Sequence, residues 1–190
     1  MTNTITQEDI RSYDTHIDAV ALQSSRVDLY ENSEFAIFRN MPSKSKGAAF
    51  EKIFEEYCTN ELGFTVEKPS NTGHDRVING NVRVEIKGST IWNGGGFKFQ
   101  QIRTQQDYDV VAFLFIYPDR IEVWGADKDV VRENLEVQDS DGNWIYNQHG
   151  GKSVNSGTFW FDCSGPEDVP WLEPFTMCVA TIVKEETHGE

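Results

Sequence analysis

Cysteine and histidine are scarce in this chain of 190 residues, which contains three cysteines and four histidines. The cysteines are odd in number, far apart and set among apolar residues, at Cys58, Cys163 and Cys178. This pattern argues against a disulfide framework and predicts buried thiols in a reducing, cytoplasmic compartment. The histidines show neither an H-E-x-x-H pattern nor a spacing to paired cysteines. A structural zinc site is therefore not expected.

Long hydrophobic runs are also missing, and the first ten residues, MTNTITQEDI, lack the pattern of a signal peptide. We therefore expect no membrane partner. An excess of positive charge is missing as well, because the formal net charge is -14. Such a charge argues against a protein that coats nucleic acid nonspecifically.

The charge is distributed unevenly along the sequence. Residues 1–43 have a net charge of -4, residues 44–107 of +1 and residues 108–190 of -11. The middle segment holds 9 of the 17 lysines and arginines. A local basic cleft on an acidic body suits an enzyme that binds DNA in one defined pose, and the alternative is ordinary scatter of surface charge.

The most informative segment is His74–Lys87, which reads HDRVINGNVRVEIK. Its second half alternates apolar and charged residues, which is the period of a half-buried β-strand. Strand geometry places Glu85 and Lys87 on one face, ~6.6 Å apart along the strand. Two carboxylates and an ammonium that meet at one strand end can hold Mg²⁺ and orient a water against a phosphodiester.

The second carboxylate of this group is Asp75, and its position depends on the turn. The dipeptide Asn79-Gly80 predicts a hairpin that returns Asp75 to the neighbourhood of Glu85. A strict two-residue turn would place Asp75 opposite Val84, on the wrong face. A three-residue loop over residues 79–81, a bulge or a kink at Asp75 would place it opposite Glu85. Carboxylates brought together in this way predict a raised carboxylate pKa until a cation binds.

An amphipathic helix is predicted upstream, over residues 46–62 (KGAAFEKIFEEYCTNEL), because its apolar residues recur at helical spacing. Gly63 stands where a helix C-cap is expected. Glu51 lies at the edge of the apolar arc, from which its carboxylate can reach over a sheet toward a metal. Glu55 is the other candidate for this role, and the alternative for either is a solvated helix carboxylate.

The spacing of Asp75 and Glu85-Ile86-Lys87 resembles the active-site motif of the PD-(D/E)xK nuclease superfamily, with His74 in place of the proline. Gly47-x-x-x-Glu51 followed by Leu62-Gly63-Phe64 is similar to the opening of many members. The resemblance implies a site that binds Mg²⁺, for which Mn²⁺ can substitute, and catalytic residues Asp75, Glu85, Lys87 and Glu51. The implied metal ligands are the carboxylates of Asp75, Glu85 and Glu51 and the backbone carbonyl of Ile86.

The remaining elements predict an α/β fold with a mixed central β-sheet flanked by helices, as in a restriction-endonuclease-like core. The apolar run 110–117 (VVAFLFIY) indicates a buried central strand, 121–124 the next strand and 127–135 a helix with Asp127 as its N-cap. Residues 6–40 have helical spacing in parts, and residues 159–161 indicate a strand. We expect one nuclease domain, 1–190, with an N-terminal helical flank (1–43), a catalytic core (44–135) and C-terminal strands with a DNA-contacting loop (136–190).

Candidate DNA contacts come from three polar segments: the basic linker 43–46, the stretch 97–106 and the glycine-containing loop 148–156. Their donors suit phosphates and base edges, and they are Lys44, Lys46, Lys98, Gln100, Gln101, Arg103, His149, Lys152, Ser153 and Asn155. The resemblance also implies a glutamine after the lysine strand, which Gln100 or Gln101 would supply. The alternatives are a polar helix surface at 97–106 and a plain surface loop at 148–156.

The sequence thus predicts a Mg²⁺-dependent endonuclease that hydrolyses double-stranded DNA and is of the restriction type. We expect a homodimer, and a cognate DNA methyltransferase is a candidate partner. A junction resolvase or a repair nuclease would use the same residues on branched or damaged DNA. A non-catalytic DNA-binding module would keep the fold without the catalytic group.

Overall fold

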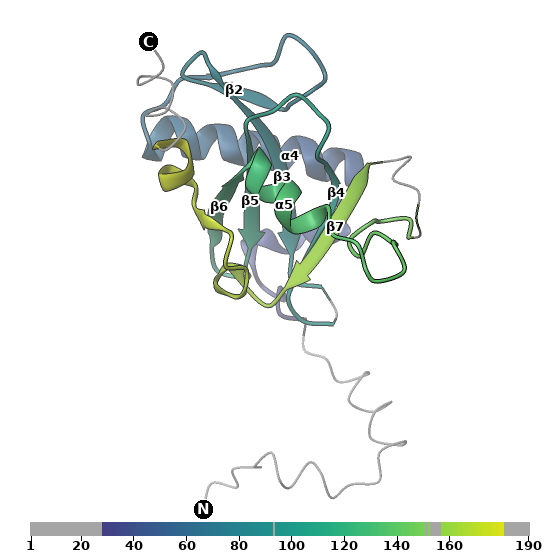
Figure 1. The fold of residues 1–190 in the computed structure, drawn as a ribbon. Coiled ribbons are helices and arrows are strands. Elements are labelled where there is room, and N and C mark those ends of the chain that lie inside the picture. The colour runs from purple at the N-terminus through teal and green to yellow at the C-terminus, as the bar shows by residue number, and fades with distance from the viewer. Residues whose placement is uncertain (1–27, 93, 151, 153–156, 181–190) are drawn as a thin grey trace, which may run out of the picture.

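The computed structural model describes residues 28–92, 94–150, 152 and 157–180 (Figure 1). A six-stranded sheet has the order β1-β2-β3-β5-β6-β8, and β4 and β7 form a separate two-stranded ribbon. The strands of the large sheet are β1 (Val66–Glu67), β2 (Arg76–Ile78), β3 (Val82–Thr90), β5 (Val110–Ile116), β6 (Ile121–Asp127) and β8 (Glu173–Pro174). The ribbon strands are β4 (Phe97–Arg103) and β7 (Thr158–Cys163). Because β3 and β5 are parallel and their other neighbours antiparallel, the sheet is mixed, as predicted.

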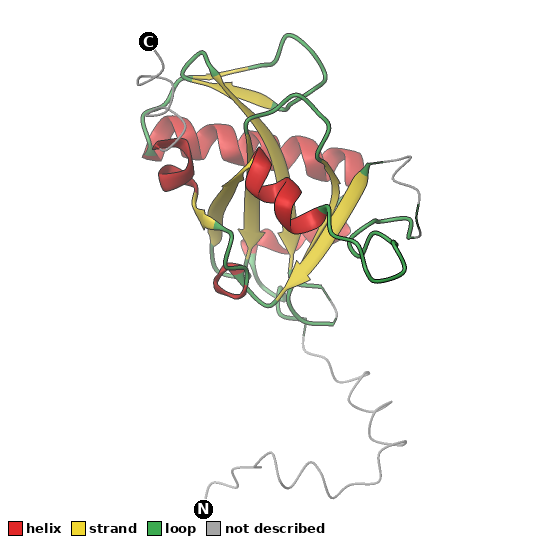
Figure 2. Cartoon of the chain, in the orientation of Figure 1, coloured by secondary structure: helices red, strands yellow, loops and turns green. Residues whose placement is uncertain are grey.

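Helices cover both faces of this sheet (Figure 2). The longest is α4 (Ser43–Glu56), which lies behind the sheet, and α5 (Lys128–Leu135) lies in front of it. Shorter elements are η1 (Glu34–Ala36), α3 (Ile37–Asn40), the π-helical turn η2 (Tyr57–Glu61) and η3 (Pro166–Asp168), and residues 175–180 are also helical. The predicted mixed α/β architecture is therefore confirmed.

Strand β5 is the centre of the molecule, and every residue in it is buried. Its continuous apolar run fits this place because both of its faces are covered. One face joins the core under α4, which includes Phe50 and Phe54, and the other joins a core built from the β4–β7 ribbon and α5. Phe99 and Phe161 stack across the ribbon with ring centroids 5.2 Å apart. The sheet is therefore a partition between two hydrophobic cores.

The helix α4 begins earlier than predicted, whereas its end agrees with the prediction. Residues 43–46, predicted as a linker, form its first turn, in which the Lys46 N–H donates to the Pro42 carbonyl at 2.9 Å. Proline just before a helix favours this start because its own missing N–H would have no helical partner. At the other end the helix continues into η2 and stops before Gly63, whose φ of 69° is the left-handed conformation expected at a C-cap.

Other predicted elements agree or change type. The N-cap of α5 is confirmed, because Asp127 accepts a hydrogen bond from the Asp129 N–H at 2.8 Å. Residues 97–103 of the stretch 97–106 form strand β4, so the alternative of a polar helix surface is wrong. Part of the predicted helical segment 6–40 lies outside the described residues. Among the described residues, no helix has both the length and the apolar character that a membrane span requires.

Candidate active site

The turn between β2 and β3 has the three-residue form that the predicted site needs. Ile78 pairs with Val82 and Arg76 with Val84, which leaves residues 79–81 as the loop. Asn79 and Gly80 have positive φ angles of 51° and 81°, for which glycine and asparagine are suited. Because β2 begins at Arg76, which pairs with Val84, the hairpin brings the preceding residue, Asp75, beside this part of β3.

Asp75 is attached to the edge of β3 by two hydrogen bonds. Its backbone N–H donates to the Val84 carbonyl at 2.9 Å, and its Oδ2 accepts from the Ile86 N–H at 2.8 Å. In a strand, the N–H and C=O of one residue point to the same edge. The Ile86 carbonyl therefore points to the edge that carries the Asp75 carboxylate.

Glu85 and Lys87 lie side by side on the face of β3 that is opposite to α4. The Lys87 Nζ donates to the Glu85 Oε1 at 2.6 Å, and Glu85 is only 6% exposed. Burial raises the pKa of Glu85, the Lys87 ammonium opposes this, and the charge of Asp75 adds to the increase. The net direction is upward, which agrees with the carboxylate pKa expected from the sequence.

The helix carboxylates face a different partner, which the sequence reasoning missed. Arg76 is 8% exposed, and its Nη1 donates to the Glu51 Oε2 at 2.8 Å and to the Asp75 carbonyl at 2.7 Å. Its Nε reaches the Glu55 Oε2 at 3.4 Å. The sequence did contain a sign of this contact. Strand alternation puts Arg76 on the same face as the apolar Ile78, and a buried charge requires partners.

The structure therefore separates the predicted carboxylates into two groups. Glu51 and Glu55 approach from α4, on the face where Val84 packs, whereas Glu85 lies on the other face. Arg76 stands between Glu51 and Asp75. Among the described residues, no three aspartate, glutamate, histidine or cysteine side chains gather into a ready-made metal site. Asp75 and Glu85 are the pair that the fold brings together.

Two residues of the segment 104–109 form hydrogen bonds near the start of β3. The His74 Nδ1 is 2.9 Å from the Asp107 carbonyl, and Asp109 Oδ2 accepts from the backbone N–H of Arg83 at 2.8 Å and from its Nε at 3.0 Å. Burial would raise the pKa of Asp109, but the hydrogen bonds from Arg83 lower it. The Asp109 contacts hold β3 at Arg83, two residues before Glu85.

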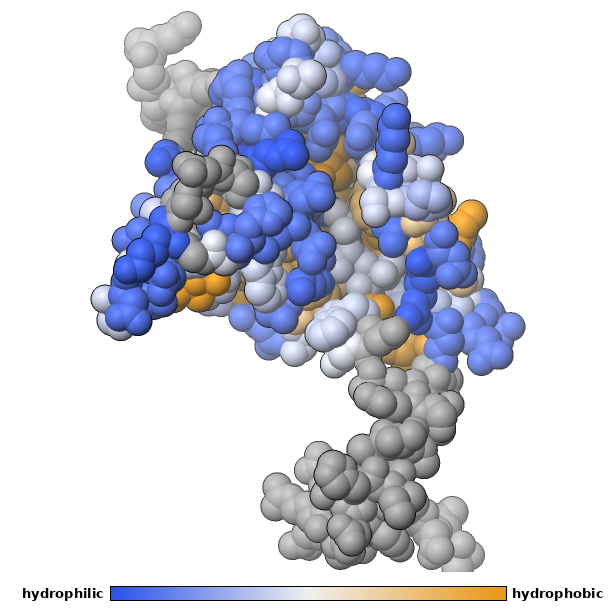
Figure 3. All heavy atoms as spheres, turned by 90° about the vertical axis from the view of Figure 1, so that its right-hand side faces the viewer, coloured by the Kyte–Doolittle hydropathy of each residue, from blue (hydrophilic) through white to orange (hydrophobic). Residues whose placement is uncertain are grey.

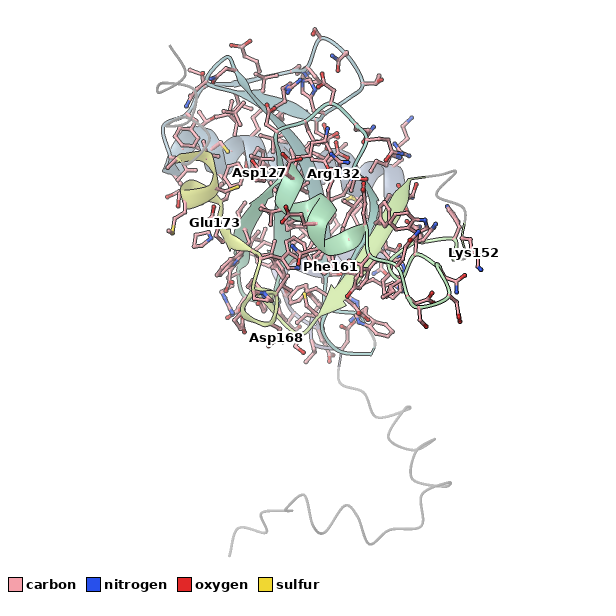
Figure 4. All side chains as sticks on the ribbon, in the orientation of Figure 1. Asp127, Arg132, Lys152, Phe161, Asp168 and Glu173 are labelled. Carbon is pink, nitrogen blue, oxygen red and sulfur yellow. The ribbon has the colours of Figure 1, made fainter. Side chains whose placement is uncertain are left out.

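The candidate DNA contacts occupy several places. Lys44 and Lys46 lie on the first turn of α4, and Lys98, Gln100, Gln101 and Arg103 lie on β4. The strand β4 is in contact with β3, which carries the paired carboxylate. His149 and Lys152 are exposed, and Lys152 lies at the right-hand edge of the molecule in Figure 4. Ser153 and Asn155 lie outside the described residues.

Figure 3 shows the side of the molecule on which the β4–β7 ribbon lies. This side is largely hydrophilic and is hollowed near its centre, where less polar atoms are visible. The candidate site combines an acidic pair, an ammonium and a neighbouring strand with amide and guanidinium side chains. It can bind a hard cation and a phosphate at the same time.

No protein-family model matches this sequence, and no curated protein matches it. Among solved structures, the fold is similar to that of the bacterial homing endonuclease I-Ssp6803I, with a TM-score of 0.45 and 16% sequence identity. The match covers 77% of this chain and 99% of the other. At this level of likeness, the function has to be argued from the geometry of the site.

Proposed function

We propose that this protein is a Mg²⁺-dependent endonuclease that hydrolyses phosphodiester bonds in double-stranded DNA. The observation that carries the proposal is the grouping of Asp75, Glu85 and Lys87 at one end of the β2–β3 hairpin. Glu85 is buried with its charge beside the partly exposed Asp75 and Lys87, and an apolar side chain would pack in its place at lower cost. Such a cost is typical of a functional site.

The donors of this site fit Mg²⁺. Asp75 and Glu85 supply hard carboxylate oxygens, and the Ile86 carbonyl points to the same edge as Asp75. Mg²⁺ keeps several waters and is commonly bound by one or two carboxylates, so a third protein carboxylate is not required. We propose Asp75, Glu85 and Ile86 as the ligands and Mn²⁺ as a substitute ion. Glu51 would assist from the α4 side, where Arg76 now holds it.

A bound Mg²⁺ supplies Lewis-acid charge stabilisation next to the scissile phosphodiester. The residues of the chain supply the rest. Asp75 and Glu85 accept hydrogen bonds from an attacking water and hold it in line. Lys87 balances the charge of Glu85 in the structure, and the same ammonium can donate to a phosphate oxygen as negative charge develops there.

The proposed substrate is plain duplex DNA cut at a preferred sequence, as in a restriction enzyme. Cations and amides on β4 and on the first turn of α4 would dock the duplex, and the acidic remainder would limit nonspecific binding. In this proposal the active form is a homodimer, because two copies are needed to cut two strands, and a cognate DNA methyltransferase would protect the host sequence.

Digestion of a mixed-sequence plasmid with Mg²⁺, followed by mapping of the ends, tests this function. Discrete ends at one sequence support the restriction-type proposal, whereas cleavage confined to a four-way junction or a damaged duplex would assign a resolvase or repair role. Calorimetry with Mg²⁺ and Mn²⁺ on the wild type and on Asp75→Asn tests the metal site. DNA binding without metal affinity and without cleavage would identify a non-catalytic binding module and contradict the proposal.

A further inference from the structure

The ribbon strand β4 contains an irregularity beside the proposed active site. Phe99 pairs with Phe161 and Ile102 with Phe159, so that Gln100 and Gln101 together stand opposite the single residue between those partners. Two residues opposite one define a β-bulge. The bulge keeps Phe99 and Ile102 both buried while it presents both glutamines on the exposed side.

The bulge is backbone-strained and held in place. Gln101 has a φ of 58°, a left-handed conformation that glycine adopts freely and that costs energy for a residue with a side chain. Its N–H donates to the Gln148 Oε1 at 2.9 Å, and Gln148 is itself anchored through its N–H to the Thr158 carbonyl at 2.9 Å. A strained residue clamped from a neighbouring loop motivates a functional explanation.

The bulge is also located next to the strand that carries Lys87. On one side of the bulge the Lys98 N–H donates to the Ser89 Oγ at 2.9 Å. The strands β3 and β4 are in contact. The two glutamines therefore lie two and three residues after a point at which β4 is hydrogen-bonded to β3.

The side-chain amides of Gln100 and Gln101 are better suited to contact base edges than to bind phosphates. An amide is neutral, so it adds little to the attraction of phosphates, but it carries a donor and an acceptor that match the N6 and N7 of adenine in the major groove. A two-stranded ribbon has the width to enter that groove. Lys98 is already engaged, with its Nζ 4.3 Å from the centre of the Trp160 ring and Asp162 opposite it in the register.

We propose that Gln100 and Gln101 are specificity-determining residues that read adenine edges in the major groove next to the cleaved phosphodiester. The inference rests on the proposed endonuclease function. In this arrangement the bulge serves to place two consecutive amides on one side of the ribbon, which a regular strand cannot do because its side chains alternate between faces. Gln148 is the positioning residue that maintains the bulge.

The test uses a duplex library with a randomised centre, cut with Mg²⁺ and sequenced at the ends. The variants are Gln100→Ala, Gln101→Gly and, as a matched control, Gln138→Ala, which removes an exposed glutamine after α5. We expect the wild type to prefer A·T pairs beside the cut. Each ribbon variant should relax the preference at one position by about 5- to 150-fold, which corresponds to the ~1–3 kcal/mol of one bidentate contact.

The Gln101→Gly variant separates specificity from folding. Glycine relieves the positive φ, so the melting temperature should stay the same or rise while the base preference falls. Mg²⁺ affinity should not change in either ribbon variant. A wild type that cuts without base preference, or ribbon variants that cut every sequence with the wild-type profile or with uniformly lower rates, would overturn the readout while the endonuclease function stands. A wild type that cuts no duplex would contradict the proposed function itself.

Discussion

The ammonium of Lys87 lies 2.6 Å from the Glu85 Oε1, so a partly exposed cation neutralises a carboxylate that is almost fully buried. The two residues are separated by Ile86, whose side chain points to the opposite face and packs under α4. One face of this strand therefore carries the paired charges and the other carries the packing. Substitutions on the two faces should consequently affect different properties of the protein.

Lys87→Ala should abolish DNA cleavage and leave the fold nearly intact, because the side chain contributes charge and little core packing. Rates of plasmid cleavage and thermal unfolding measured side by side check this. Lys52→Ala is the matched control, since that lysine is exposed on α4 and pairs with Glu56 at 3.6 Å. Retention of more than about a tenth of the wild-type rate, roughly 1.4 kcal/mol of barrier, would remove Lys87 from the mechanism.

In buffer with a chelator, Glu85→Gln should have a higher free energy of unfolding than the wild type at pH 8. The difference between the two proteins should be smaller at pH 4. Burial raises the pKa of Glu85 in the folded state above its value in the unfolded chain. The folded protein therefore binds more protons than the unfolded one between these two pKa values, and wild-type stability falls as pH rises through that interval. Glutamine does not ionise and avoids this loss.

Urea unfolding at both pH values measures the effect. A Glu85→Gln variant that is less stable than the wild type at pH 8, with no dependence of the difference on pH, would show that the ion pair with Lys87 outweighs the burial of the carboxylate.

Arg76→Met should destabilise the fold by about 1–3 kcal/mol, because it leaves Glu51, Glu55 and the Asp75 carbonyl without their shared donor. This expected loss of stability is smaller than that for a fully buried ion pair, since the Glu51 and Glu55 side chains are 33% and 45% exposed. Denaturant unfolding checks the value. Glu56→Gln, on an exposed part of the same helix, should change stability little, and an equal loss in both variants would contradict the bridging role of Arg76.

Gly88→Ala should cost about 1–3 kcal/mol by overpacking. A Cβ on Gly88 would lie 2.4 Å from Cδ2 of the buried Phe50 ring. The same substitution in a Phe50→Leu background should cost less, and a double-mutant cycle gives the coupling. Gly47→Ala is the control, because among the described residues no atom beyond its own helix backbone and its chain neighbours lies within 4 Å of its Cβ position. That change should stabilise the helix by about 0.4–1 kcal/mol.

Lys152→Ala should weaken DNA binding without a change in the cleavage chemistry. If the exposed Lys152 contacts one phosphate, its loss makes the slope of log affinity against log salt shallower by about one unit. If it contacts a base edge, discrimination at one base pair should relax by ~1–3 kcal/mol. Binding to several duplexes at several salt concentrations separates the two. Identical affinities and salt slopes on every duplex would leave Lys152 as part of a plain surface loop.

The sequence by itself determined the elements whose pattern is local. The alternation at residues 82–87 predicted strand β3, the apolar run 110–117 predicted the central strand β5, and the amphipathic period predicted the helix α4. Burial of one face or of both fixes which residues of such elements are apolar. The hairpin with Asp75 near Glu85 also followed from local chemistry, although the choice between a two-residue and a three-residue loop did not.

Only the tertiary structure decided the contacts between distant segments. The Arg76 bridge to Glu51 joins residues 25 positions apart, and no periodicity along the chain reports such a pairing. For the stretch 97–106 the sequence left a polar helix surface open as an alternative. The strand β4 forms there because it pairs with β7, which comes about sixty residues later in the chain. Backbone hydrogen bonds and side-chain packing across the fold settle these choices because their free energy exceeds the small local preferences of the segments involved.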